Sequence, residues 1–286
     1  MKRLFIIGNG FDLCHHIKSK YSDFQNFAYK SNGYMASQME IFYPNICNEE
    51  YMWGDVEKAL GQIDPRETYE ECNSDFEIDY DHMMRSAAYL EDNPMILLEQ
   101  ILNDFHKCFE EWVQNIDISF VKINDTFNFT SEDLFFTFNY TDTLESVYDI
   151  EDKNINHIHG NRIKGEPLVI GFGSDCEHLF EKSVSDTTYE ENSFQNICEI
   201  ANREEKNTYE IIKYNYRYWD TLKGIDDVTV IGHSYSIVDL SYFKKIYQSI
   251  SINAYWHLNY HSLTDKKNAE YLIKEIGIKS YELIKC

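Results

Sequence analysis

The feature that most constrains the fold is a short apolar run near the start of the chain that ends in two glycines. Leu4 to Ile7 are consecutive apolar residues, and Gly8-Asn9-Gly10 follows them directly. Continuous apolarity over so few residues is typical of a parallel strand that helices cover on both faces. Glycines directly after such a strand let the backbone turn tightly and approach a neighbouring group closely. The segment therefore predicts a central strand that turns into a helix.

Similar apolar runs recur along the chain and predict further strands of the same sheet. They lie at 134–138, 168–172, 228–232 and 254–258. Several of them end in a glycine or a polar residue and continue into a helical pattern, which is the alternation that builds a parallel sheet. The sequence thus predicts an α/β fold with a Rossmann-like parallel sheet.

The interval between the first two runs is mostly helical. Its clearest helix is predicted to start at Asn93 as the N-cap, with Pro94 in the first helical position and apolar residues at three- and four-residue steps up to Ile116. We therefore expect one domain with a large helical insertion after the first strand. The expected boundaries are 1–286 for the domain, 1–20 plus 131–286 for its core and about 21–130 for the insertion.

The charge balance bears on the partners of the protein. The chain has 26 basic and 49 acidic residues and a net charge of −23. Proteins that bind nucleic acid duplexes take much of their affinity from Lys and Arg on phosphates, so nucleic acid is not expected as a partner. Two intervals, 64–93 and 177–206, are strongly acidic. Each predicts either a solvated surface or a mobile lid.

The cysteines and the apolar segments bear on location. The seven cysteines are scattered without a C-x-x-C pair, which favours reduced thiols. The apolar run after Lys2-Arg3 stops at Gly8, which is too short for the apolar region of a signal peptide. No segment approaches the roughly 18 apolar residues of a membrane span. We therefore expect a cytoplasmic protein with no membrane partner.

Two motifs at predicted strand ends are candidates for ligand binding. In Gly8-Asn9-Gly10-Phe11-Asp12, the following helix would direct its N–H groups at an anion. The motif lacks the third glycine of a dinucleotide fingerprint and the lysine of a P-loop, so a structural turn is the other interpretation. Phe138-Asn139-Tyr140-Thr141-Asp142 also follows an apolar run. Its polar residues either cap the next helix or lie where ligands bind in open sheets.

Two further motifs contain histidines. In His157-Ile158-His159-Gly160-Asn161, both histidines would share one face of a strand and could ligate a metal, but two ligands are an incomplete site and no metal is expected. His159 could instead act as a general base. Gly232-His233-Ser234-Tyr235-Ser236 resembles a nucleophile elbow that lacks its second glycine. A second phosphate- or ribose-binding turn, with Asp239 capping the next helix, is the other interpretation.

Taken together, these motifs resemble the bacteriophage abortive-infection AbiH family. The matching segments run in order over nearly the whole chain, and the ordered set is more specific than any one of them. They are IIGNGFDL (6–13), YSDF (21–24), WGDVE (53–57), FNYTDTLE (138–145), HIHGN (157–161), IGFG (170–173) and IGHSYSIVD (231–239). The resemblance implies a role in phage defence.

The same order of motifs resembles the sirtuin-like nucleotide-binding fold, in which several defence proteins cleave NAD. That resemblance implies NAD or a related nucleotide as substrate or ligand, and no required cofactor. It implies that Asn139 orients the ribose and an attacking water, that His159 is a base, and that Asp12 accepts from a ribose hydroxyl or is catalytic. The implied ligand-binding residues are Gly8, Asn9, Gly10, Phe11, Tyr140, Gly160, Gly232, His233, Ser234 and Asp239.

The sequence also departs from the sirtuin-like pattern. Phe11-Asp12 stands where that turn usually continues with a serine, and Asp142 stands one place later than the usual acid. The zinc cysteines of sirtuins are absent, so deacylase activity is not expected. The WGDVE segment belongs to the AbiH pattern alone, and Asp55 or Glu57 could be carried into the site by the insertion.

Three functions are therefore weighed. The leading one is an abortive-infection enzyme that hydrolyses the N-glycosidic bond of NAD. The alternatives are a nucleotide-sensing module without turnover, and a metal-dependent hydrolase or nuclease that uses His157 and His159. A homo-oligomer and a phage-derived trigger are left open as partners.

Overall fold

The computed structural model of the protein describes residues 2–47, 53–54, 56–165, 167–173 and 188–286. The chain forms two compact units. The first, which we call the sheet unit, consists of Met1–Lys20, Val113–Val169 and Asn207–Cys286. The second, the helical unit, consists of Tyr21–Trp112 and Ile170–Lys206. The chain therefore enters the helical unit twice, once after the first strand and once after the third.

The sheet unit contains a six-stranded sheet in which every pair of neighbouring strands is parallel. The strands are β1 (Arg3–Ile7), β2 (Leu134–Thr137), β3 (Ile155–His157), β4 (Asp227–Ile231), β5 (Tyr255–Tyr260) and β6 (Tyr281–Lys285). Their order is β3-β2-β1-β4-β5-β6, so the chain reverses its direction across the sheet between β1 and β4. The predicted parallel α/β sheet is confirmed. All carboxyl ends meet at one edge, where such sheets bind ligands beside the reversal.

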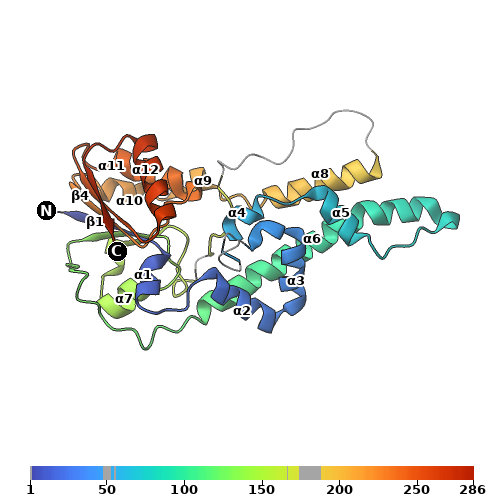
Figure 1. Ribbon diagram of the computed structural model, residues 1–286, viewed down its shortest axis with the longest axis horizontal. Helices are drawn as coiled ribbons and strands as arrows, with labels where there is room; N and C mark the ends of the chain where they lie inside the picture. The colour runs from blue at the N-terminus through green and yellow to red at the C-terminus, as the bar shows by residue number, and fades with distance from the viewer. Residues whose placement is uncertain (1, 48–52, 55, 166, 174–187) are drawn as a thin grey trace. The chain divides into compact units, whose positions relative to one another are not determined.

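Both faces of the sheet are covered. One face carries α10 (Tyr216–Thr221), α11 (Leu240–Ser249) and α12 (Leu263–Ile276), and the other carries α1 (Asn9–Cys14) and α7 (Thr143–Tyr148) (Figure 1). Leu4 and Ile6 pack with residues of the first three helices, whereas Phe5 and Ile7 pack with residues of α1 and α7. Successive side chains of a strand point to opposite faces, so a doubly covered strand is apolar throughout. The sheet unit also contains α9 (Thr208–Tyr214).

The helical unit is built around a cluster of aromatic rings. Phe24 contacts Trp53, Phe105, Phe109 and Trp112, with ring centroids 5.2–5.5 Å apart. The helices of this unit are α2 (Tyr21–Ser31), α3 (Gly33–Phe42), α4 (Val56–Leu60), α5 (Pro65–Cys72), α6 (Met83–Gln114) and α8 (Tyr189–Asn202). None of the helices in the described ranges has the length and apolarity that a bilayer crossing requires.

The helix expected to begin after Asn93 is α6 in Figure 1. It begins at Met83 instead, and Pro94 lies inside it. A proline in a helix lacks the N–H that would bond the carbonyl four residues earlier, which here belongs to Leu90. The side chain of Asn73 donates to that carbonyl at 3.3 Å, and the side chain of Asn93 donates to the Cys72 carbonyl at 2.8 Å. The expected helix start was wrong because tertiary contacts compensate for the proline.

Two further expectations about strands differ from the structure. The apolar run 168–172 is not a strand, and only Phe172 forms an isolated bridge, to Glu205. Ile170 and Phe172 are buried in a loop, whereas Leu168 and Val169 are half-buried. A Cβ on Gly171 would lie 2.1 Å from the carbonyl oxygen of Glu204. Conversely, β6 was not predicted. It pairs with β5 alone and most of its side chains are exposed, so its sequence lacks an apolar run.

A buried ion pair joins the two chain segments of the helical unit. Lys206 Nζ lies 2.7 Å from Glu57 Oε1, and no part of the lysine side chain is exposed. The backbone N–H of Lys206 also donates to the Phe172 carbonyl at 2.8 Å. Removing one partner of a buried pair leaves an uncompensated charge in a dry environment.

We expect Lys206→Met to lower the free energy of unfolding by about 3–5 kcal/mol, because Glu57, whose side chain is only 20% exposed, would keep its charge without its partner. The double variant with Glu57→Gln should recover part of that loss. Urea unfolding followed by circular dichroism measures both. Lys213→Met is the matched control, since Lys213 is exposed and pairs with Glu210 at the surface, so its loss should stay below about 1 kcal/mol. Equal effects at both lysines would contradict the role of the buried pair.

Candidate functional site

The turns that follow β1 and β4 are in backbone-to-backbone contact. The N–H of Gly8 donates to the Ile231 carbonyl at 2.9 Å, and the N–H of Gly10 donates to the Gly232 carbonyl at 2.7 Å. A Cβ on Gly232 would lie 2.3 Å from the Phe11 nitrogen, and its φ of +67° is one that L-residues rarely adopt. The glycines are therefore needed for this contact. The N–H groups of Gly8 and Gly10 are used within the protein.

Asp12 lies in the first turn of α1 and is buried against the turn after β2. The hydroxyls of Thr141 and Thr143 donate to its two carboxylate oxygens at 2.6 and 3.0 Å. Burial raises the pKa of Asp12 above its ordinary value, and hydrogen bonds from Thr141, Thr143 and Asn139 offset that only in part. Among the described residues, the buried Oδ1 of Asn139 has no hydrogen-bond partner. This buried amide oxygen at the carboxyl edge therefore has an unused capacity to accept a hydrogen bond.

Asp239 lies between two histidines on neighbouring turns. The backbone N–H of Tyr235 donates to His233 Nδ1 at 2.8 Å, so the ring hydrogen is on Nε2. That Nε2 lies 3.2 Å from Asp239 Oδ2, and His159 Nε2 lies 3.9 Å from Asp239 Oδ1. One interpretation of the sequence was that Asp239 caps the following helix. It precedes α11 but makes no side-chain capping bond, because its carboxylate turns to the histidines instead.

Aromatic rings pack around the two histidines. The Phe138 ring lies 4.5 Å from the His233 ring and 5.4 Å from the His159 ring, measured between centroids. Tyr140 and Tyr242 also pack on His159, at 6.3 and 5.6 Å. A carboxylate and an imidazole surrounded by rings interact more strongly than they would in water. The arrangement is suited to holding a proton on His159 next to a fixed negative charge.

His157 bonds to residues of the turn after β2 and of α7. Its Nδ1 donates to the Asn139 carbonyl at 2.9 Å, and its Nε2 lies 3.0 Å from Glu145 Oε1. Asn161 donates to the same Glu145 oxygen at 2.9 Å. The expectation that His157 and His159 share one face of a strand was wrong, because β3 ends at His157. In the described part of the chain, no group of three His, Cys, Asp or Glu side chains could hold a metal ion.

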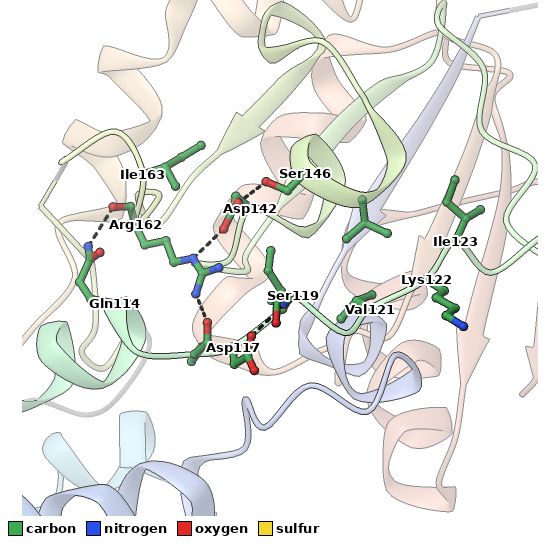
Figure 2. A pocket seen from close by; sticks show the side chains of 13 residues that line it. Gln114, Asp117, Ser119, Val121, Lys122, Ile123, Asp142, Ser146, Arg162 and Ile163 are labelled. Atoms are coloured by element: carbon green, nitrogen blue, oxygen red, sulfur yellow. Dashed lines mark hydrogen bonds and ion pairs between the residues drawn. The ribbon is translucent and has the colours of Figure 1, made fainter.

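A surface cavity of about 770 Å³ lies beside these turns (Figure 2). Arg162 donates to Asp142 Oδ1 at 2.6 Å and to the carbonyls of Val113 and Ile116. Burial alone would raise the pKa of Asp142, but hydrogen bonds from Ser146 and Arg162 hold it below the ordinary value. No candidate catalytic residue lines this cavity. Of the two basic residues that line the cavity, Arg162 is paired with Asp142, and Lys122 is exposed.

The structure brings most of the predicted site residues to the carboxyl edge in three contacts. Gly8, Gly10 and Gly232 meet in the first, Asp12 and Asn139 in the second, and His159, His233 and Asp239 in the third. Gly160 lies in the turn after β3, where its N–H donates to the His157 carbonyl at 3.2 Å. These residues come from the ends of four adjacent strands.

Other predicted residues have structural contacts of their own. Asn9 exchanges hydrogen bonds with Ser19, and Phe11 packs in the smaller core of the sheet unit. The Tyr140 hydroxyl donates to the Val169 carbonyl at 2.9 Å, and Ser234 is exposed. Of the two acids considered for the insertion, Glu57 pairs with Lys206, and Asp55 lies outside the described residues. Residues 177–187 of the second acidic interval also lie outside them.

Sequence reasoning missed several residues that hold the turns in place. Thr141 and Thr143 fix Asp12, Glu145 fixes His157, and Arg162 fixes Asp142. The FNYTDTLE motif contains the threonines and the glutamate, but their position after a strand also fits helix capping. A signal that could have separated the two interpretations is the surplus of polar residues, since one residue is enough for a cap.

The opposite pKa shifts of Asp12 and Asp142 predict opposite dependences of stability on pH. The folded protein holds a proton on Asp12 more tightly than the unfolded chain does, so stability falls as pH rises from the ordinary value of 3.8 towards the raised pKa. Relative to Asp12→Asn, the parent should lose stability over that window. Relative to Asp142→Asn, it should gain stability as pH rises through the lowered pKa up to 3.8. Urea unfolding at a series of pH values measures both slopes, and equal signs would contradict the assignment.

Comparison with known proteins bears on the identity of this site. A family model described as Bacteriophage abortive infection AbiH matches residues 4–260. This range includes the turns after β1, β2, β3 and β4, and it also spans the helical unit. No curated protein and no solved structure matches the chain. The match covers most of the 286 residues, and the chain therefore belongs to the bacteriophage abortive infection AbiH family.

Proposed function

We propose that this abortive-infection protein is an enzyme that hydrolyses the N-glycosidic bond of NAD or a related nucleotide at the carboxyl edge of its sheet. The observation that carries the proposal is the placement of His159 and Asn139 on adjacent turns, with Asp239 beside the histidine. The Nε2 of His159 lies 3.9 Å from the Asp239 carboxylate. A carboxylate at this distance stabilises the positive charge that the imidazole gains when it accepts a proton.

In the proposed reaction, water attacks C1′ of the ribose while the C1′–N bond breaks. The electron pair of that bond returns to the ring nitrogen of nicotinamide, which leaves as a neutral molecule and needs no proton. His159 takes the proton that the water loses. The unpartnered Oδ1 of Asn139 would accept from a ribose hydroxyl or from the water. A positioned base contributes about 10²–10⁴ in rate.

The charge of the carboxyl edge fits this reaction. Asp239 and Glu145 bring carboxylates to these turns, whereas Arg162 is already paired with Asp142. The departing nicotinamide carries positive charge in the substrate, and the sugar develops it in the transition state. Negative groups favour both, as in other glycoside-cleaving sites. Gly8, Gly10 and Gly232 would act by holding the turns after β1 and β4 together, since the N–H groups of Gly8 and Gly10 are used within the protein.

Binding without turnover is the second candidate. Asp12, Asn139, His159 and Asp239 are each less than one-tenth exposed. A site closed to this degree suits a sensor that reports a bound nucleotide as well as it suits an enzyme that opens during its cycle. A nucleotide should raise the melting temperature in either case, and only product formation separates the two.

We expect His159→Gln to lower NAD hydrolysis by about 10²–10⁴-fold, because the base is removed while the buried volume is kept. Asn139→Ala should lower kcat through loss of the ribose or water contact. NAD consumption is measured on purified protein and in phage-infected cells. The matched controls are His261→Gln and Asn253→Ala, since both positions are exposed. Parental rates in both site variants would overturn the assignment, and a nucleotide-dependent melting shift without any product would favour the sensor.

Asp239→Asn tests whether the carboxylate acts through His159. The neutral amide cannot stabilise an imidazolium, so kcat should fall while KM changes little. The limb of the pH–rate profile that reports the base should also move to lower pH. A variant with an unchanged pH profile and a raised KM would instead place Asp239 in nucleotide binding.

A further inference from the structure

The first turns of α6 and the segment before them carry exposed apolar side chains among acidic ones. We call residues 75–89 the tip segment. Its exposed apolar side chains are Ile78, Tyr80, Met83, Met84 and Tyr89, with exposed fractions of 44, 78, 54, 85 and 45%. Its acidic residues are Asp75, Glu77, Asp79 and Asp81, all of them exposed. Acidic and apolar residues alternate from Glu77 to Asp81, a pattern that neither a buried core nor a purely solvated loop requires.

The tip segment is held in a defined conformation by its own contacts. The backbone N–H of Asp79 donates to the Ser86 hydroxyl at 3.1 Å, and His82 Nδ1 lies 2.9 Å from Asp79 Oδ2. The rings of Phe76 and Tyr89 stack with centroids 4.4 Å apart. These contacts fold the segment back onto the first turns of α6. The exposed methionines and tyrosine are therefore presented on an ordered surface, which lowers the entropy cost of binding.

The charge of this surface selects the class of partner. Acidic side chains repel nucleic acid and anionic lipid. They also repel a second copy of this chain, which carries a net charge of −23. A basic partner is attracted, and it must also offer apolar groups to cover the methionines and the tyrosine. Methionine side chains adapt to partners of varied shape, and amphipathic helices are commonly recognised by such surfaces.

We propose that the tip segment is a docking surface for a basic amphipathic helix of another polypeptide. Tyr80, Met83 and Met84 contact the apolar face of that helix, and Asp75, Glu77 and Asp81 pair with its lysines or arginines. This proposal does not depend on the reaction proposed above, because none of these residues belongs to the sheet unit. It assigns a function to the acidic interval that the sequence left as either a solvated surface or a lid.

The test uses the full chain and a fluorescent synthetic helix of leucine and lysine about 15 residues long. Binding is measured by fluorescence anisotropy at several salt concentrations. The triple variant Tyr80→Ser, Met83→Ser and Met84→Ser should raise Kd roughly tenfold or more, because it removes the apolar anchors. The triple variant Asp75→Asn, Glu77→Gln and Asp81→Asn should raise Kd and reduce the salt dependence. All six side chains are exposed, so both variants should keep the parental melting temperature.

Matched controls separate local recognition from the overall negative charge of the chain. Tyr209→Ser, Tyr214→Ser and Ile252→Ser remove comparably exposed apolar groups from the sheet unit. Asp125→Asn, Glu132→Gln and Glu275→Gln remove three exposed acids there. Both controls should bind the peptide within about twofold of the parent, and a peptide of the same composition in scrambled order should bind at least tenfold more weakly. Equal affinity for all four variants, equal affinity for both peptides, or no binding to the parent would overturn the proposal.

Discussion

The rest of the carboxyl edge depends on the backbone contact between the turns after β1 and β4. Gly10 and Gly232 lie so close that a single added methyl group would displace one turn from the other. This contact fixes where α1 begins, and so it places Asp12 under the hydroxyls of Thr141 and Thr143. It also fixes the loop that carries His233 next to the Phe138 ring. The glycines thus position the chemical groups by close packing, apart from any direct contact they make with a ligand.

The carboxyl edge combines a dense polar network with an arginine, Arg162, that is already paired with Asp142. Residues that stand at helix N-cap positions, Asp142 and Asp239, make no capping bonds with their side chains. Each gives up a local hydrogen bond worth about 1 kcal/mol in exchange for a long-range contact, to Arg162 or to the histidines. Such exchanges cost helix stability locally, and they concentrate carboxylates where four strands end. The result is an edge better matched to developing positive charge than to a free phosphate.

The sequence predicted the parts of the fold that follow from short-range patterns. β1, β2, β4 and β5 are apolar over most of their length because helices or other strands cover them, and their positions were predicted to within one or two residues. β6 was not predicted because an edge strand needs no apolar run. A strand was wrongly predicted at 168–172 because a partly buried loop can also contain an apolar run. The start of α6 could not be read locally, since the bond that compensates for Pro94 comes from Asn73.

For the site, the sequence identified residues but not their partners. Asn139 and Asp239 stood out because each follows an apolar run, and His159 stood out because it lies two residues after His157 and directly before Gly160. The pairing of His233 with Asp239 depends on one backbone N–H, that of Tyr235, which fixes the ring hydrogen on the nitrogen facing the carboxylate. No sequence pattern indicated the role of Arg162. Its three hydrogen-bond acceptors are distant in sequence, and two of them are backbone carbonyls.

Pro94 also has a consequence for how the helical unit folds. An isolated helix with a proline at this position has a break in its hydrogen-bond ladder, so its two halves would form independently or not at all. Asn73 can donate its hydrogen bond to the Leu90 carbonyl only after α5 has packed against this helix. Asn93 in turn donates to the Cys72 carbonyl at the end of α5. The continuity of the longest helix is therefore a tertiary property. Its first half, which includes the part of the tip segment from Met83 onward, becomes helical in the same cooperative step that assembles the unit around it.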